Sequence, residues 1–193
     1  MEGLENVTKF QIESLLNEVE RDGIDDLMKF LENSDFYTAP ASGRYHSNFK
    51  GGLAIHSLNV YNIFNKKLDE YNITYPKDTK ILVPILHDLC KVNNFTIDFR
   101  GKKNKATGKW DQVPYYKTED LFPAGHGEKS VIRLQEFMKL TKDEALMIRW
   151  HMGGYEPKEN YNYLNNSWAI CKAGCLLHTA DLEATYLLET VKE

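Results

Sequence analysis

Apolar residues recur every three or four positions over most of the chain, which is the pattern of amphipathic α-helices. Within residues 1–37 the pattern breaks at Gly23, so we expect two short helices there that serve as a packing element. Thr141, with Glu144 three residues later, is a capping-box pattern at the start of a helix. Further helices are predicted from 53 to 71, from about 78 through the pair His87-Asp88, over 127–140 and 141–150, and over 167–191, with a polar loop at 156–166. The pattern therefore predicts an all-α fold.

One segment departs from this pattern, because residues 95–118 alternate apolar and polar positions around a turn near Thr107 and Gly108. Such alternation predicts a β-hairpin inserted between helices. Six basic residues against one acid lie between Phe99 and Lys117. The hairpin is either an ordinary solvated one or a basic lip that attracts phosphate beside a pocket.

Length and composition describe an ordinary globular chain of one domain. The 193 residues are 42% hydrophobic and 27% charged, and the net charge is −4. That charge argues against a stable nucleic-acid complex. The longest apolar runs are far shorter than a membrane span, and the acidic N-terminus lacks a signal peptide. Three cysteines, an odd number in apolar contexts, are expected to be free thiols in a reducing compartment, so we expect a cytoplasmic protein.

A histidine and an aspartate stand side by side, His87 and Asp88, directly after the apolar run 81–86. The apolar neighbours predict a buried helix, which Pro84 should kink. Two adjacent ionisable groups are costly to bury unless something charged compensates them. A divalent metal would do so, because imidazole and carboxylate are both good ligands.

Other candidate ligands are spread over several of the predicted helices. A lone histidine in a helix is usually a hydrogen-bonded core or surface group, but a helical bundle can project several such groups onto one centre. The set consists of His56, His87, Asp88, His126, His151 and Asp181.

The order of this set resembles that of the HD-domain metal-dependent phosphohydrolases, over roughly residues 36–186. The matching motifs are residues 51–58 (Gly-Gly-Leu-Ala-Ile-His-Ser-Leu), 86–91 (Leu-His-Asp-Leu-Cys-Lys) and the pair Ala180-Asp181. The loop 39–46 before Gly51 is similar to the HD domains of 3′–5′ exoribonucleases and to small HD hydrolases of bacteria and phages. In the latter group, residues 125–130 and 148–154 have close counterparts. The chain has no room for an N-terminal OB-type RNA-binding domain, so processive RNA digestion is not expected.

The resemblance implies a single HD-type domain over 1–193, with residues 1–37 as the packing element and 38–191 as a metal-binding helical core. It also implies a first metal held by His56, His87, Asp88 and Asp181. A second metal would be held by His126 and His151, with Asp88 bridging; alternatively, a single metal is bound and these two histidines bind substrate or act as acids. Mixed His and carboxylate ligation suits Mn, Fe, Co, Ni or Zn better than Mg.

The implied activity is hydrolysis of a phosphomonoester or phosphodiester, with a nucleotide as the expected substrate, through a metal-activated hydroxide. Asp88 would be catalytic as well as a ligand, and Lys91, Arg44 and His46 could hold the phosphate or the leaving group, although a surface role for Lys91 is equally open. Two alternatives remain: a short-oligonucleotide phosphodiesterase or 3′–5′ nuclease, and a metal-bound nucleotide-sensing module without turnover. The sequence leaves the oligomeric state open.

Overall fold

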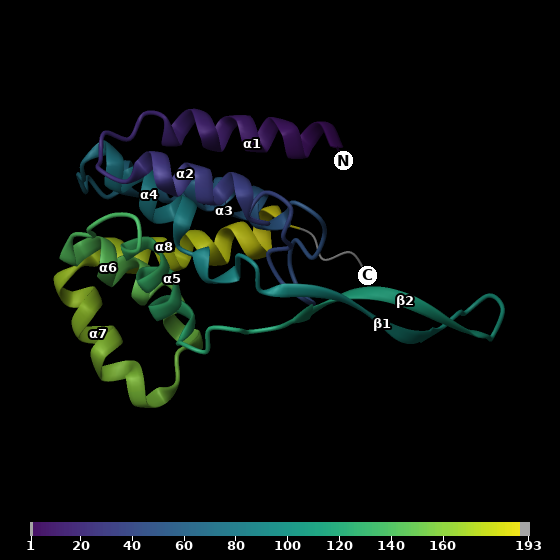
Figure 1. The fold of residues 1–193 in the computed structure, drawn as a ribbon. Helices are drawn as coiled ribbons and strands as arrows, with labels where there is room; N and C mark the ends of the chain where they lie inside the picture. Colours follow the sequence, from purple (N-terminus) through teal and green to yellow (C-terminus); the bar gives the residue numbers. More distant parts are fainter. Residues whose placement is uncertain (1, 190–193) are drawn as a thin grey trace.

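The computed structural model describes residues 2–189 and is mostly helical, with one antiparallel hairpin. Figure 1 shows the hairpin extending away from a body of helices. The helices are α1 (Glu2–Leu16), α2 (Ile24–Asn33), α3 (Gly52–Glu70), α4 (Lys77–Leu86), α5 (His126–Gln135), α6 (Lys142–Arg149), α7 (Tyr161–Ile170) and α8 (Lys172–Glu183). The strands are β1 (Phe95–Lys103) and β2 (Trp110–Thr118), and a short 3₁₀ turn, Leu89–Lys91, follows α4. This confirms the predicted helical fold with a hairpin insertion. None of the helices in the described part is long and apolar enough to cross a membrane.

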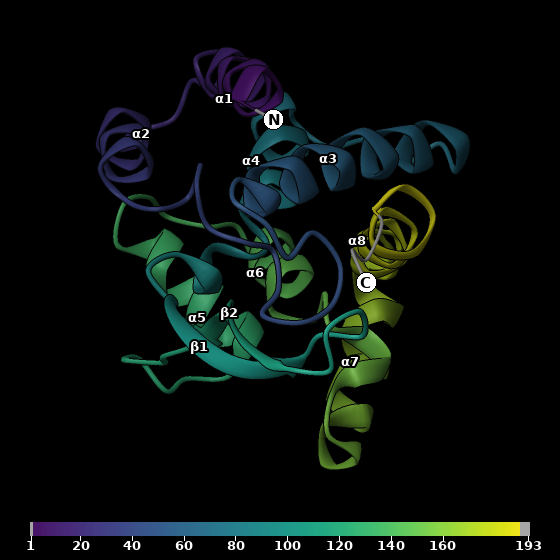
Figure 2. The same ribbon diagram turned by 90° about the vertical axis from the view of Figure 1, so that its right-hand side faces the viewer.

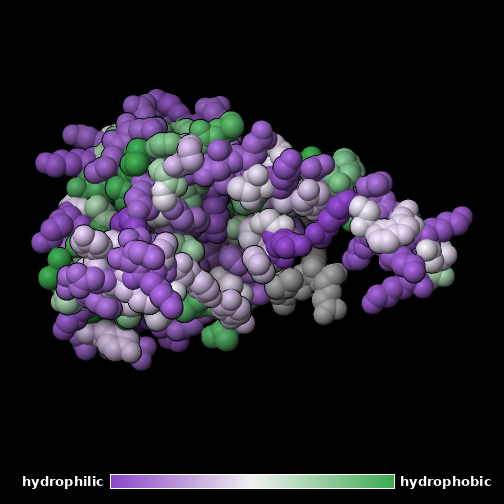
Figure 3. Space-filling view, turned by 90° about the horizontal axis from the view of Figure 1, so that it is seen from below, coloured by the Kyte–Doolittle hydropathy of each residue, from purple (hydrophilic) through white to green (hydrophobic). Residues whose placement is uncertain are grey.

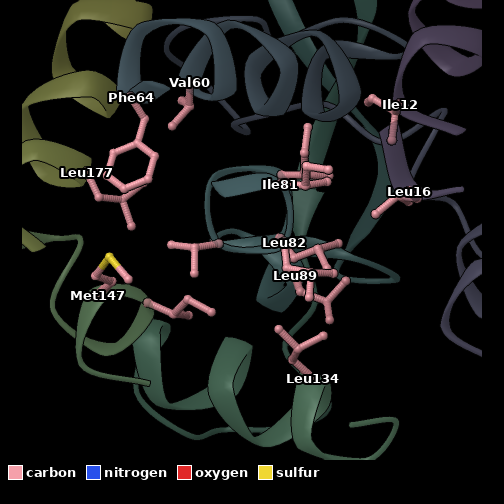
Figure 4. Packing of buried hydrophobic residues seen from close by; sticks show 14 of the residues in the cluster. Ile12, Leu16, Val60, Phe64, Ile81, Leu82, Leu89, Leu134, Met147 and Leu177 are labelled. Atoms are coloured by element: carbon pink, nitrogen blue, oxygen red, sulfur yellow. The ribbon is translucent and has the colours of Figure 1, made fainter. Parts of the chain in front are cut away.

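The core forms around α4, whose apolar run is buried on all sides. This helix packs against α3, α6 and α1, and α3 packs in turn against α8 (Figure 2). Leu82 and Leu89 lie beside Leu134 of α5, and Ile81 lies on the side of Ile12 and Leu16 of α1 in the same cluster (Figure 4). The two N-terminal helices therefore contribute side chains to the core that supports the rest of the chain.

Pro84 lies inside α4, as predicted, and a side chain of a neighbouring helix replaces the hydrogen bond that it cannot make. Proline has no N–H to give to the carbonyl of Lys80, four residues earlier. The side-chain amide of Asn65, on α3, donates to that carbonyl at 3.1 Å. The helix ends two residues later at Leu86, so His87 and Asp88 lie in the turn that follows α4 and not inside the helix as expected.

The prediction of one long C-terminal helix over 167–191 is wrong. Helix α7 already begins at Tyr161, inside the stretch predicted as a loop, and the chain breaks at Cys171, where φ is −127° and ψ is 82°. Helix α8 ends at Glu183 and a wider π-type turn, Ala184–Leu188, follows, while residues 190–191 of the prediction lie outside the described part. No proline or glycine marks the break. Burial of Cys171 and Ala173 in the core, which the local pattern does not encode, accompanies it.

Candidate metal centre

Five separate segments bring all six predicted ligands to one place. His56 lies on α3, His87 and Asp88 follow α4, His126 begins α5, His151 follows α6, and Asp181 lies on α8. The imidazole rings form a chain of neighbours, with centroids 5.3 Å apart for His56 and His87, 4.9 Å for His87 and His151, and 5.2 Å for His151 and His126. Ligand atoms of these residues fall into overlapping groups of three, each within 4.8 Å.

The approach of His126 to His151 depends on a glycine. A Cβ on Gly127 would lie 2.1 Å from the carbonyl oxygen of Arg149. Only glycine therefore lets the first turn of α5 pass this close to the end of α6. This contact brings His126, the first residue of α5, within ring-contact distance of His151.

Asp88 occupies the middle of the centre, and its two carboxylate oxygens face different histidines. Oδ2 lies 3.6 Å from Nε2 of His56 and 3.5 Å from Nε2 of His87. Oδ1 lies 2.7 Å from Nε2 of His126 and 3.5 Å from Nε2 of His151. The arrangement therefore has two halves that share one carboxylate.

Hydrogen bonds fix three of these rings from behind. Nδ1 of His87 lies 2.8 Å from the carbonyl oxygen of Pro84, and Nδ1 of His151 lies 2.6 Å from that of Ile148. Nδ1 of His56 lies 2.9 Å from the carboxylate of Glu189. Because a carbonyl or carboxylate oxygen can only accept, each Nδ1 must carry the proton and donate.

The opposite nitrogens of the same rings then carry lone pairs when the rings are neutral, and they point toward Asp88. The Nε2 atoms of His56, His87 and His151 are buried and meet the geometry of no hydrogen bond among the described residues, and only carboxylate oxygens lie near them, that of Asp181 at 3.2 Å from His56 and those of Asp88 at 3.5–3.6 Å. A buried polar atom without a partner costs about 1–3 kcal/mol, so the Nε2 atoms of His87 and His151, and that of His56 when its ring is neutral, require an explanation. A divalent metal bound by Nε2, with Nδ1 held by an oxygen, is the usual arrangement of a histidine ligand. The residues present therefore fit a metal.

Charges around the centre shift several pKa values. Burial lowers the pKa of His87 to about 4, and it also lowers that of His126. Burial raises the pKa of Asp88, but Lys91, with Nζ 2.6 Å from Oδ2, and the histidines more than offset this and hold the carboxyl ionised. Burial likewise lowers the pKa of His56, yet the carboxylates of Asp181 and Glu189 raise it to about 10. Metal binding at His56 would therefore displace a proton.

Glu189 is the residue of the centre that the sequence did not identify. Besides His56, it accepts hydrogen bonds from the hydroxyl of Ser47 at 2.7 Å and from the amide of Asn59 at 3.2 Å. It follows the turn after α8 and belongs to no recognisable motif, and the predicted continuous helix ran straight through it. No local signal marks a residue that reaches the centre only because the chain turns back.

Of the three supporting residues predicted from the sequence, Lys91 and His46 lie at the centre and Arg44 lies outside it. Lys91 is held against Asp88 and is not a surface lysine. His46 stacks near His56, with ring centroids 4.9 Å apart, and its buried Nε2 has no partner among the described residues. Burial lowers the pKa of His46 to about 4. Arg44 is exposed and lines a hollow outside the ligand cluster, so it is not among the groups that surround Asp88.

Two further residues contribute to this environment. His178, on α8, places Nδ1 2.7 Å from the carbonyl oxygen of His151 and packs against Trp168. The thiol of Cys90 lies 3.4 Å from Nε2 of His126. All three cysteines are free, as expected.

Comparison with family models, with curated proteins and with solved structures finds no match to this chain. The function therefore has to be argued from the site itself.

Proposed function

We propose that this protein is a metal-dependent phosphohydrolase of the HD type, acting on a phosphomonoester or phosphodiester of a nucleotide. The observation that supports it most strongly is the set of inward-facing, unpartnered Nε2 atoms around Asp88. A structural histidine cluster would pair these atoms with protein donors or acceptors. The order of the ligands along the chain, which resembles that of HD-domain enzymes, supports the same proposal.

His56, His87, Asp88 and Asp181 would hold a first ion. His126 and His151 would hold a second, with one oxygen of Asp88 facing each half of the centre. When bound, a transition metal of the Mn, Fe, Co, Ni or Zn type would supply Lewis-acid activation of water and of a phosphoryl oxygen. Asp181, on α8, is partly exposed and lies 3.2 Å from Nε2 of His56, at the edge of the centre.

The chain's own cations would position the phosphate. A hollow of about 300 Å³ beside the centre is lined by Lys91 and His126, among others. That volume suits a phosphate ester of nucleotide size. Lys91 neutralises Asp88 and faces this hollow, so it can also meet an anionic oxygen of the substrate. His46 is neutral at physiological pH because its pKa is lowered to about 4, so it could accept a hydrogen bond from the substrate beside His56.

The test is metal analysis combined with a turnover screen. Untagged protein should contain one to two equivalents of a transition metal by elemental analysis. With added Mn²⁺ it should hydrolyse members of a panel of nucleoside phosphates, cyclic dinucleotides and generic phosphodiesters. His126→Ala should reduce the metal content from two equivalents to one if the centre is binuclear.

Glu136→Ala, an exposed change at the end of α5, is the matched control and should leave both readouts unchanged. Metal-free, fully stable protein would contradict the proposal. Protein that binds metal and nucleotide without turnover would instead indicate a sensing module.

A further inference from the structure

The hairpin carries a strong local charge that the net charge of the chain conceals. It contains six basic residues and only two acidic ones, Asp98 and Asp111, although the whole chain is acidic. Lys117 lies 3.7 Å from Asp98, but the other basic side chains have no carboxylate within 4 Å in the described part of the chain. These unpaired cations are Arg100, Lys102, Lys103, Lys105 and Lys109. At roughly 3.3 Å per residue, the nine-residue strand β1 spreads them along an arm of about 30 Å.

The same arm exposes large apolar rings. Ile97, Phe99 and Trp110 are 66%, 62% and 72% exposed. The register pairs Phe99 with Pro114 and Trp110 with Lys103, which places these rings on one face of the hairpin. Arg100 and Lys102 lie on the other face by alternation. Figure 3 shows the end of the arm standing clear of the body on this face, with none of the described elements over it.

The base of the arm is hollowed toward the metal centre. A hollow of about 470 Å³ lies between the hairpin and the 38–52 loop and is lined by Arg44, Tyr45, Arg100, Tyr115, Tyr116 and Lys117. The guanidinium of Arg100 lies 5.2 Å from the centre of the Tyr115 ring. This hollow shares Gly43 and Thr118 with the 300 Å³ hollow that contains Lys91 and His126. Cations and aromatic rings thus continue from the arm to the edge of the centre.

We propose that the arm and these two hollows form a binding track for single-stranded nucleic acid that leads a phosphodiester to the metal centre. Phosphates would contact Lys103, which shares the face of the exposed rings, and Arg44 and Arg100 at the base of the arm, and unpaired bases would stack on Trp110 and Phe99. Cations that follow a backbone, interleaved with rings that stack on bases, are the features by which proteins bind single strands. A duplex hides the faces of its bases and is too wide for a 300 Å³ hollow, so it does not fit.

This proposal replaces the expectation against nucleic-acid binding that the net charge suggested. Hydrolysis of the strand rests on the proposed function, whereas binding to the arm does not. The two parts can therefore fail separately.

Binding is measured on the full chain by fluorescence anisotropy with labelled oligo(dT) and oligo(U) of roughly 12 nucleotides, and with a duplex of the same length. Chelator is present, so that binding is observed without turnover. The two single strands distinguish DNA from RNA as the ligand. We expect single strands to bind at least tenfold more tightly than the duplex, with an affinity that falls as salt rises.

The variant Arg100→Gln/Lys102→Gln/Lys103→Gln should weaken binding at least tenfold. It should also reduce the slope of log Kd against log salt by about 2, since each phosphate contact on a single strand contributes about 0.7. Trp110→Ala should weaken binding about fivefold or more through lost stacking, with less change in the salt slope. The matched control, Lys139→Gln/Lys142→Gln/Lys172→Gln, removes three exposed lysines that lie outside the arm and should bind as the wild type does.

Three results would overturn the proposal. These are equal affinity of the arm variant and the control variant, tighter binding of the duplex, and an arm-dependent dimer in light scattering without nucleic-acid binding. The last would identify a second copy of this chain as the partner of the exposed rings. Strand binding without any metal-dependent hydrolysis would refute the proposed function and leave the track intact. Hydrolysis of small phosphodiesters, together with unchanged strand binding in the arm variant, would refute the track and leave the proposed function intact.

Discussion

Glu144 and Asp88 are two of the carboxylates buried in the described part of the chain, and their surroundings differ in one decisive respect. Glu144 accepts two hydrogen bonds from Arg21, at 2.9 and 3.0 Å, one from the hydroxyl of Thr79 at 2.6 Å, and one from the backbone of Thr141 at 2.8 Å. Each of these partners is a donor, so the cluster is complete. Asp88 is equally buried, but of its histidine neighbours His56, His87 and His151 each have an Nε2 without a partner among the described residues.

Because the partners of Glu144 are all protein donors, its cluster is structural, whereas the unpartnered nitrogens around Asp88 fit a ligand. The Glu144 cluster joins the loop after α1 to α4 and to the start of α6, where the predicted capping box is present. Its charges compensate each other, as buried charges must. Nitrogens around Asp88 remain unsatisfied in a region where each costs free energy, which is expected of a site that has its full set of contacts only with a cation.

The largest expected effect is on turnover when Asp88 is changed. Asp88→Asn removes the charge shared by both halves of the centre, and we expect at least about a thousandfold loss of metal-dependent hydrolysis, or about 4 kcal/mol. In excess chelator the same variant should lose less unfolding free energy than a variant of the Glu144 cluster. Initial rates and urea unfolding measure the two quantities. Residual activity near the wild-type level would remove Asp88 from the reaction.

The second-largest expected effect is on stability, when the Glu144 cluster is broken. Arg21→Ala leaves the buried Glu144 without its counter-charge, and we expect the free energy of unfolding to fall by about 3–5 kcal/mol. Lys29→Ala, in an exposed pair with Asp26, should cost less than about 1 kcal/mol. Urea unfolding with chelator measures both. Equal losses in the two variants would mean that the ion pair of Arg21 with Glu144 contributes no more stability than an exposed pair.

The pH dependence of this stability has a definite sign. Burial raises the pKa of Glu144, but hydrogen bonds from Arg21, Thr79 and Thr141 outweigh it and hold the pKa below its usual value. The stabilisation is therefore present above the unfolded pKa of about 4.5 and is lost as pH falls through the lower folded pKa. The stability difference between wild type and Arg21→Ala should shrink as the pH falls below about 4.5.

The smallest expected effect is on metal affinity, when the carboxylate that orients His56 is changed. Glu189→Gln weakens the acceptor that fixes Nδ1 of His56, and we expect metal affinity to fall about 10–100-fold with the fold unchanged. Competition with a chelating dye measures the affinity. Glu183→Gln, on α8 and paired with Lys67, is the control and should leave it unchanged. An unchanged affinity in Glu189→Gln would show that His56 is oriented without this carboxylate.

Local patterns in the sequence were enough to predict much of this molecule. The existence of the helices up to residue 150 and of the hairpin follows from periodicity, because burial of one face imposes its period on the side chains, although α5 ends at Gln135, short of the predicted 140, and α4 ends before His87. The capping box at Thr141 also rests on contacts between neighbours in the chain. The candidate ligands could be named because histidine and carboxylate in apolar surroundings are costly, and each of the six lies at the centre.

Contacts between distant segments decided the rest. Glu189 reaches His56 across 133 positions because the chain breaks at Cys171 and turns again after Glu183, and neither feature has a local signal. The tertiary structure likewise places Arg44 and Arg100, which are far apart in the chain, around the same outer hollow. By itself, the sequence determined which residues could carry the chemistry. Only packing, which brings together atoms that no local pattern relates, determined which of them face one another.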